Sequence, residues 1–392
     1  MECIGPSGPL VSDFGVEGGL AKDQTFYDVF CAPFPKHLEV WLITQFAIEI
    51  CTDNDKTHCL SGKVQISYPR MGLWKKQMLV FTTFTISVLA FPHHGDQVQH
   101  TLLLGGSPVG DDDFDGFTTS IQMITEDSVC PPDIPKLPVR REMASGELLG
   151  SRVFYCGGYF SSDTPGVKST CHSYHLDDQA VSWEEEPSMM FSRHSFGLTA
   201  VNEKLFASGG LGELDYHRSV ESFTPNEGWQ VEDQMQFSQY RVYHCAVDLG
   251  SWLIIIGGCV GQTPASSSSV EAFDTSLLSE SNSASWWTLA SMLEPRRAHA
   301  CKTGEFEGQP GMFVTGGIDS ANHPVSTVEF YVAESDCWRK VASMANARYY
   351  HSTTMVGGRI VVAGGGPSYQ SVEVFNGSHW MEGSRLEYGV YR

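Results

Sequence analysis

Leu253-Ile254-Ile255-Ile256-Gly257-Gly258 is one of six places in this 392-residue chain where a short apolar run ends in two glycines. Successive diglycines are 52, 52, 48, 59 and 48 residues apart. A period near fifty is typical of radial β-repeats, because helical solenoids mostly have shorter units. Glycines at strand ends suit positions where the backbone takes a positive φ or passes close to a neighbour. The six pairs are Gly105-Gly106, Gly157-Gly158, Gly209-Gly210, Gly257-Gly258, Gly316-Gly317 and Gly364-Gly365.

Three further landmarks follow the diglycines in a fixed order. The first is a run such as Ser219-Val220-Glu221-Ser222-Phe223, whose period of two predicts a strand with one packed face. The second is a tryptophan. The third is an arginine followed three residues later by an aromatic or histidine side chain, which we call the ring, as in Arg241 and His244. The tryptophans are Trp183, Trp229, Trp286, Trp338 and Trp380, and the arginines are Arg193, Arg241, Arg296, Arg348 and Arg385.

In this order the landmarks resemble the kelch repeat family over roughly residues 100–392. The resemblance implies an all-β fold, a β-propeller in which every repeat forms one four-stranded blade. We expect the tryptophans to pack between neighbouring blades. We expect the arginines to bind several carbonyls or the glutamates of the alternating runs, because a guanidinium group carries several donors.

The end of the chain predicts how the propeller closes. Arg385–Tyr391 repeats the Arg-x-x-ring segment that elsewhere begins an innermost strand, but no diglycine strand follows it. Its simplest partner is Leu102–Leu104, because this pairing covers both exposed edges. The sequence therefore predicts six blades closed by the C-terminal strand, with Tyr388–Tyr391 beside Leu102–Leu104.

Residues 71–90 have the build of a secretory signal peptide. Basic Lys75-Lys76 precedes an apolar stretch that ends at Ala90, a small residue suited to cleavage. The alternative is a first inner strand over residues 79–90, since their β-propensity is high. A transmembrane helix is disfavoured, because the run is too short. The signal is favoured because such a strand would be a seventh inner strand, so we expect a secreted propeller over residues 91–392, with a cytoplasmic protein as the alternative.

Residues 1–70 carry none of the repeat landmarks, and we assign no function to them. Many kelch proteins carry a dimerising, cullin-recruiting module of about two hundred residues or more before the propeller, and seventy residues are too few to hold it. Whether residues 1–70 belong to the functional protein depends on whether the signal peptide is real.

The chain is acidic, with a formal net charge of −21. This charge disfavours nucleic acid as a partner, since phosphate binding needs dense basic charge. It suits a basic or cationic partner, although acidity can also serve solubility alone. We expect the seven cysteines of the repeats to act mostly as small buried apolar residues. Asn376-Gly377-Ser378 is an acceptor for glycosylation if the chain is exported.

Two groups of side chains raise the question of a metal. Asp111, Asp113 and Asp115 match the start of a calcium loop. Gln122 occupies the position where such a loop has a glutamate ligand, so we favour a solvated acidic loop over a calcium site. Three histidines, at the same position in three repeats, could together bind a metal at the central channel. Packing is the favoured role, because Phe196, Tyr388 and Met143 take the equivalent place elsewhere. The histidines are His244, His299 and His351, and we expect no cofactor.

Loops that follow the diglycines vary in length and chemistry while the strands stay constant, which is typical of binding surfaces on rigid scaffolds. The sequence thus predicts a non-enzymatic module that binds a protein or peptide. A substrate-binding adaptor for a ubiquitin ligase is the alternative, and a copper oxidase of the kelch type is a weaker one. The loops are 107–118, 159–168, 211–218, 259–268, 318–325 and 366–369, and the expected contact residues are Tyr159, Phe160, Tyr216, His217, Arg218, His323 and Tyr369.

Overall fold

Two compact units, Met1–Trp74 and Lys75–Arg392, make up the computed structural model of the chain. The structure describes residues 135–386, apart from 161–165, 177–181, 262–264 and 280–284, and outside this range the strands named below. In the first unit, β1 (Leu38–Leu42) and β2 (Ile48–Thr52) form an antiparallel pair. The remaining strands belong to the second unit.

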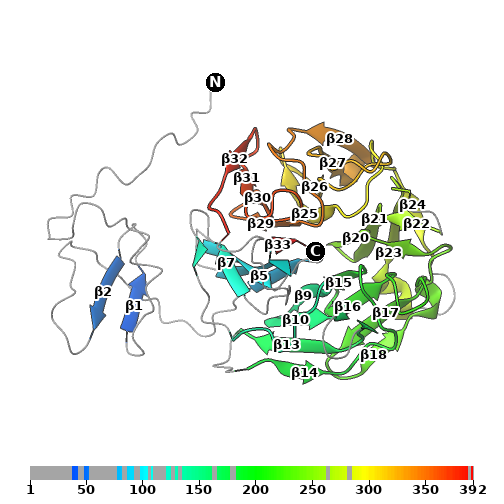
Figure 1. Ribbon diagram of the computed structural model, residues 1–392, viewed down its shortest axis with the longest axis horizontal. Helices are drawn as coiled ribbons and strands as arrows, with labels where there is room; N and C mark the ends of the chain where they lie inside the picture. The colour runs from blue at the N-terminus through cyan, green and yellow to red at the C-terminus, as the bar shows by residue number, and fades with distance from the viewer. Residues whose placement is uncertain are drawn as a thin grey trace. The chain divides into compact units, whose positions relative to one another are not determined.

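Five four-stranded antiparallel sheets follow one another along the second unit and form blades around a common axis (Figure 1). Blade 1 contains β9 (Ser145–Leu149), β10 (Arg152–Cys156), β13 (Cys171–His175) and β14 (Glu184–Glu186). Blade 2 contains β15 (Gly197–Val201), β16 (Lys204–Ser208), β17 (Val220–Thr224) and β18 (Gly228–Val231). Blade 3 contains β20 (Cys245–Leu249), β21 (Trp252–Ile256), β23 (Val270–Asp274) and β24 (Trp287–Leu289).

Blade 4 contains β25 (Ala300–Phe306), β26 (Gln309–Thr315), β27 (Val328–Val332) and β28 (Cys337–Val341). Blade 5 contains β29 (Ser352–Val356), β30 (Arg359–Ala363), β31 (Val372–Phe375) and β32 (Trp380–Glu382). The innermost strands β9, β15, β20, β25 and β29 lie next to one another in this order. Short elements complete the described part: β11 (Tyr159–Phe160), β12 (Gly166–Val167), β19 (Arg241–Val242), β22 (Cys259–Val260), and 3₁₀ turns η1 (Asp233–Met235), η2 (Thr275–Ser279) and η3 (Ala333–Ser335).

A further sheet has five strands in the order β3-β4-β5-β7-β8. They are β3 (Gln77–Phe81), β4 (Ile86–Phe91), β5 (Val98–Leu104), β7 (Ile121–Ile124) and β8 (Val129–Cys130). The all-β propeller is confirmed, but the prediction of six four-stranded blades is wrong. Five blades have that form, and the remaining sheet differs from them by its extra strand.

The predicted closure by the C-terminal strand is also wrong. The inner partner of β5 is β4, with Ile86 opposite Leu103. The C-terminal strand β33 (Val390–Tyr391) pairs instead with β6 (Ser107–Pro108), beyond the end of β5. The Arg-x-x-ring motif before this strand predicts an inner strand, but β4 already fills the inner place beside β5.

This pairing removes the reason to favour a signal peptide at residues 71–90. The signal peptide was favoured on the expectation that the C-terminal strand takes the inner place beside β5, but β4 occupies it. The strand interpretation of residues 79–90 accounts for β4 and for most of β3, which pair with each other antiparallel. Within the described residues, no helix is long and apolar enough to span a membrane.

The central residues of the diglycine strands are apolar and buried because neighbouring blades cover both faces of each strand. In β16, Leu205, Phe206 and Ala207 are all fully buried, although successive side chains point to opposite faces. The motif tryptophans join neighbouring blades as expected. The indole of Trp286 in blade 3 donates to the carbonyl of Met235, 3.0 Å away in the connection from blade 2, and Trp183, Trp338 and Trp380 make equivalent bonds to Pro135, Ala290 and Ala342.

Candidate functional site

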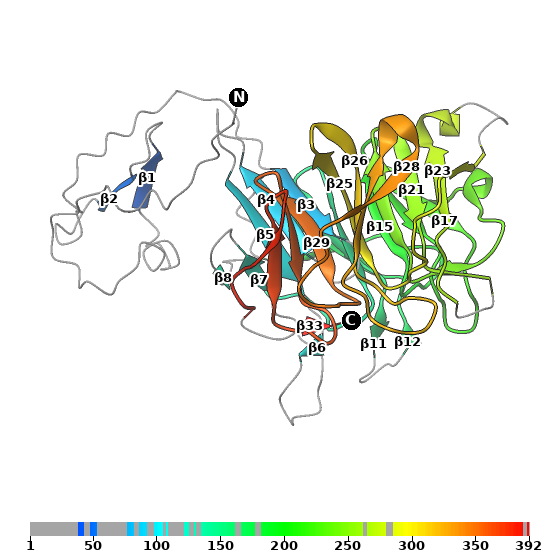
Figure 2. The ribbon, with the colours of Figure 1, turned by 90° about the horizontal axis from the view of Figure 1, so that it is seen from above.

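Each blade carries its variable loops at one end, which we call the loop face. The strands alternate in direction, so the loop after each diglycine and the connection to the next blade emerge at the same end. The short pair β11 and β12 marks this end in the side view (Figure 2). The other end carries tight turns such as the one through Asn202 and Glu203.

A buried arginine anchors the connection into each blade. Arg193 donates from Nη1 to the carbonyl of Gly209 at 2.6 Å and from Nη2 to Oε1 of Glu221 at 2.7 Å. Glu221 also accepts the backbone N–H groups of Met190 and Phe191. Arg241, Arg296 and Arg348 pair with Glu271, Glu329 and Glu373 in the same way, so the predicted role of these four arginines is confirmed.

Arg385 does not belong to this buried set. Its side chain is exposed and lines a pocket of about 570 Å³ beside the outer strands of blade 5. Tyr369 and Trp380 line the same pocket. Instead, the fifth buried arginine is Arg141, whose Nη1 donates to the carbonyl of Gly157 at 2.9 Å. The residue equivalent to the motif histidine in blade 1 is therefore Ala144 rather than Met143.

The histidines of the Arg-x-x-His motif pack against the diglycines. A Cβ atom added to Gly316 would lie 2.7 Å from Cε1 of His351 and 2.5 Å from the carbonyl oxygen of Arg348, so only glycine fits there. His351 also pairs through Nε2 with Oγ1 of Thr315 at 2.8 Å. Among the described residues, no group of three potential ligands could hold a metal. The packing role expected for His244, His299 and His351 agrees with these contacts.

The two residues between the arginine and the ring come just before an innermost strand, so they surround the axis of the propeller at the loop face, which we call the mouth of the channel. The second of them has a positive φ between 50° and 55° in every blade, a rare conformation for residues other than glycine. Their backbones form a chain of hydrogen bonds of 2.8–3.2 Å, each N–H donating to the carbonyl of the preceding blade. We call the five residues with this positive φ the mouth ring: Met143, Ser195, Tyr243, Ala298 and Tyr350.

The first of the two residues fixes the loop that follows the diglycine. Arg297, for example, forms a β-bridge with Ile318, and His194 forms one with Leu211. Equivalent pairs join Glu142 to Tyr159 and Tyr349 to Gly366. The loops of the loop face are thus held by backbone hydrogen bonds on a rigid scaffold, which suits a preformed binding surface.

Tyrosines gather at the mouth of the channel. The rings of Tyr243 and Tyr350 lie 5.8 Å apart, and the rings of Tyr349 and Tyr350 lie 5.3 Å apart. Ala298 stands between Tyr243 and Tyr350 in the mouth ring, and its small side chain leaves room for the two rings to meet. All three tyrosines are partly exposed. We call Tyr243, Tyr349 and Tyr350 the tyrosine cluster.

The residues predicted from the sequence lie on the loop face but do not form one site. Tyr159 contacts His194 with ring centroids 6.4 Å apart, and the ring of Phe160 lies 5.8 Å from Nζ of Lys168. His323 is exposed on the loop of blade 4, where its backbone N–H donates to Asp319. Tyr369 lines the pocket beside blade 5.

A second group of predicted residues lies on the loop of blade 2. The ring of Tyr216 contacts that of Tyr240 with centroids 5.9 Å apart, and the ring of His217 contacts that of Phe191 with centroids 5.5 Å apart. Burial lowers the pKa of His217, whose Nε2 lies 2.9 Å from the carbonyl oxygen of Ser192. Arg218 is exposed and donates to the carbonyl of Ser238 at 3.5 Å.

The prediction missed the tyrosine cluster, His194 and Arg297. All of them lie between the arginine and the ring of the motif, a segment for which the sequence predicted no role. A signal was present, because these two positions differ from blade to blade while the flanking residues recur. Asp111, Asp113 and Asp115 lie outside the described residues. Asn376 is exposed in the turn between β31 and β32, and its glycosylation stays a prediction.

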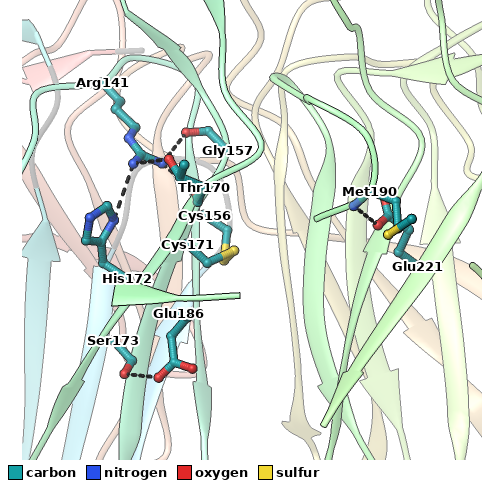
Figure 3. The surroundings of a disulfide bond; sticks show 10 residues. All are labelled: Arg141, Cys156, Gly157, Thr170, Cys171, His172, Ser173, Glu186, Met190 and Glu221. Atoms are coloured by element: carbon teal, nitrogen blue, oxygen red, sulfur yellow. Dashed lines mark hydrogen bonds between the residues drawn. A yellow bond between two sulfur atoms is a disulfide. The ribbon is translucent and has the colours of Figure 1, made fainter. Parts of the chain in front are cut away.

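Four cysteines of the propeller form disulfides rather than acting as isolated apolar residues. Cys156–Cys171 joins β10 to β13 within blade 1 (Figure 3). Cys245–Cys301 joins the innermost strands β20 and β25 of neighbouring blades. Among the other described cysteines, Cys259 is buried, and Cys337 is free and exposed. Cys245 and Cys301 hold equivalent places in successive blades, but their spacing alone does not predict that they pair.

Comparisons with known proteins agree with this architecture. A family profile described as "Kelch motif" matches residues 311–345. Kelch-like protein 36 of Bos taurus is 25% identical over 265 residues, which cover 64% of this chain and 41% of that protein. Kelch-like protein 26 of Danio rerio is 23% identical over 297 residues, which cover 72% of this chain and 47% of that protein. The chain thus spans less than half the length of these relatives.

A solved structure, titled "Structure of YjhT", resembles the chain in fold. It superposes with a TM-score of 0.53 at 12% sequence identity and covers 80% of this chain and 99% of that one. At this identity the likeness concerns the fold alone. It agrees with the kelch-type propeller described above.

Proposed function

Because the chain is a kelch repeat protein, we propose that it is a protein-interaction module whose loop face binds a protein or peptide partner. The observation that supports this proposal most is the tyrosine cluster at the mouth of the channel. Tyrosine rings offer flat apolar surface and a hydroxyl group at low entropic cost, which is why they are enriched in binding surfaces.

The scaffold supports the same proposal. The mouth ring and the β-bridges hold the variable side chains in place before any partner arrives. A preformed surface loses less conformational entropy on binding than a mobile one. The repeated arginines are buried below this surface, so they stabilise the loops without occupying the contact area.

The test is a binding assay with matched variants at the two ends of the blades. Tyr350→Ser removes a ring of the tyrosine cluster, and Trp287→Ser removes an exposed ring near the opposite end. Peptides selected from a displayed random library on the full chain serve as ligands. We expect Tyr350→Ser to weaken binding about tenfold or more and Trp287→Ser to leave it unchanged. Equal effects of both variants would contradict a role for the tyrosine cluster.

A role as adaptor for a ubiquitin ligase is a narrower version of this proposal. It is supported by the similarity to kelch-like proteins, of which the chain spans less than half. Co-purification of a cullin with the full chain from native tissue tests it. Stoichiometric copper in the purified protein would instead favour the kelch-type oxidase and contradict a non-enzymatic function.

A further inference from the structure

Exposed apolar side chains collect on two neighbouring segments of the loop face. Seven large apolar residues are exposed in the described part of the chain, and four of them lie in the connection into blade 2 and in the loop 211–218. Leu214 is 92% exposed and Met190 is 65% exposed. Phe191 and Tyr216 are the other two. A concentration of this kind marks an interaction site more often than scattered single residues do.

The loop that carries Leu214 is an ordered hairpin. Leu211 forms a β-bridge with Tyr216, and the N–H of Gly212 donates to the carbonyl of Asp215 at 2.8 Å. At its base, the N–H of His217 donates to the carbonyl of Gly210 at 2.9 Å. Leu214 is therefore held in solvent at the tip of a fixed turn, where it adds nothing to the core of the blade.

Aromatic contacts join this hairpin to its neighbours. The ring of Phe191 meets His217, and the ring of Tyr216 meets Tyr240 in the connection into blade 3. The N–H groups of Met190 and Phe191 are fixed by Glu221, so this side of the surface is also ordered. We call the resulting surface the leucine patch: Met190, Phe191, Leu214, Tyr216 and Tyr240.

Two carboxylates flank Leu214 in the sequence and on the hairpin. Glu213 accepts the N–H of Val167 at 2.6 Å, and the side chain of Asp215 is exposed. No ion pair among the described residues neutralises either of them. The nearest cation in the sequence, Arg218, donates to the carbonyl of Ser238. An apolar tip between two carboxylates is complementary to apolar side chains next to lysine or arginine.

We propose that the leucine patch anchors a linear peptide segment of a partner, in which apolar residues adjoin lysine or arginine. The apolar side chains cover Leu214 and Phe191, while the basic side chains face Asp215 and Glu213. This inference rests on the proposed function and adds to it the position of the anchor and the chemistry of the ligand. The net charge of −21 favours the same class of partner.

The test uses the full chain as bait for a displayed library of random peptides. Sequencing shows which residues are enriched, and fluorescence polarisation measures the affinity of the selected peptides at low and high salt. The variants are Leu214→Ser, Asp215→Asn and Tyr350→Ser, with Trp287→Ser as the control near the opposite end. Leu214 is almost fully exposed, so Leu214→Ser is expected to keep the melting temperature of the wild type.

We expect enriched peptides to combine apolar residues with lysine or arginine. Leu214→Ser should weaken their binding about tenfold, and Asp215→Asn should weaken it a few-fold and reduce its dependence on salt. Peptides that depend on Tyr350 but tolerate Leu214→Ser would overturn this inference and leave the proposed function standing. Enrichment of acidic peptides would also overturn it. If no peptide is enriched, both proposals are wrong for linear ligands.

Discussion

Nη2 of Arg141 lies 3.3 Å from Nδ1 of His172, at the place where each of the next four blades sets a glutamate against its arginine (Figure 3). Burial and the charge of Arg141 lower the pKa of His172 to about 4. The guanidinium of Arg141 donates to the carbonyls of Gly157 and Thr170 and to Oγ1 of Thr170, and among the described residues no ion pair joins it to a carboxylate.

Replacing His172 by glutamate should restore the pair that the other blades contain. We expect His172→Glu to raise the free energy of unfolding by about 1 kcal/mol at pH 7, because an ion pair with a carboxylate replaces a hydrogen bond to the neutral imidazole of His172. Urea unfolding measures this change, with His175→Glu on the same strand as control. A destabilised His172→Glu variant would show that the site cannot hold a carboxylate.

The pH dependence of the wild type follows from the direction of the His172 pKa shift. The folded pKa lies below the unfolded value, so the unfolded chain takes up the proton first as pH falls. The contribution of His172 is present above about pH 6.5 and is lost as pH falls toward the folded pKa of about 4. Between pH 7 and 5, His172→Glu should lose less stability than the wild type.

Removing a glutamate from one of the complete pairs should have the opposite effect. Glu221→Gln leaves the buried guanidinium of Arg193 without its countercharge and weakens two backbone hydrogen bonds. We expect a loss of about 3–5 kcal/mol in the free energy of unfolding. Glu227→Gln is the matched control, because Glu227 is exposed in a turn of the same blade. Equal stability of the two variants would contradict a structural role for the pair.

Glu147 on the innermost strand of blade 1 should make the protein less stable at alkaline pH. Burial raises its pKa to about 8, while the charge of Lys302 opposes the shift. Since the folded pKa is above the unfolded value, its contribution is complete below about pH 4.5 and is lost as pH rises through about 8. Glu147→Gln should therefore be more stable than the wild type at pH 9, and the difference should shrink at pH 5. A difference that does not change with pH would contradict this assignment.

The blades were predictable because their landmarks recur with constant spacing. Diglycines, glutamates and arginines contact one another in every complete repeat, so a pattern read along the chain reports a contact in space. The closure was not predictable in the same way. Residues 86–91 are apolar enough to resemble the core of a signal peptide, and only the register of β4 with β5 distinguishes the two interpretations.

The candidate site was predicted in part. The loops after the diglycines lie on one face as expected, but the tyrosine cluster comes from the connections between blades. Tyr243 and Tyr350 are more than a hundred residues apart and meet only because the intervening blade has Ala298 at the equivalent place. Neither spacing nor composition reports such a contact. The position of Leu214 at the tip of a hairpin likewise depends on backbone hydrogen bonds that the sequence does not display.

The disulfide between Cys245 and Cys301 should couple the stability of the propeller to the redox state. It links innermost strands of neighbouring blades that are 56 residues apart in the sequence. We expect Cys301→Ser to lower the free energy of unfolding by about 2–4 kcal/mol in an oxidising buffer, and by less when a reductant is present. Cys337→Ser serves as control, because Cys337 is free and exposed. If the reductant changes nothing in the wild type, the disulfide contributes no stability.

Removal of residues up to Ala90 should damage the propeller, although this is the cleavage that a signal peptide would require. Such a cut removes β3 and nearly all of β4, so that β5 loses its inner partner and exposes an unpaired edge. We expect a chain that starts at Phe91 to unfold at a lower temperature and to aggregate more readily than a chain that starts at Lys75. Thermal unfolding with light scattering compares the two chains, and N-terminal sequencing of the native protein shows which end exists. A stable, monomeric chain from Phe91, together with a native N-terminus at that residue, would restore the signal peptide and contradict the inner position of β4.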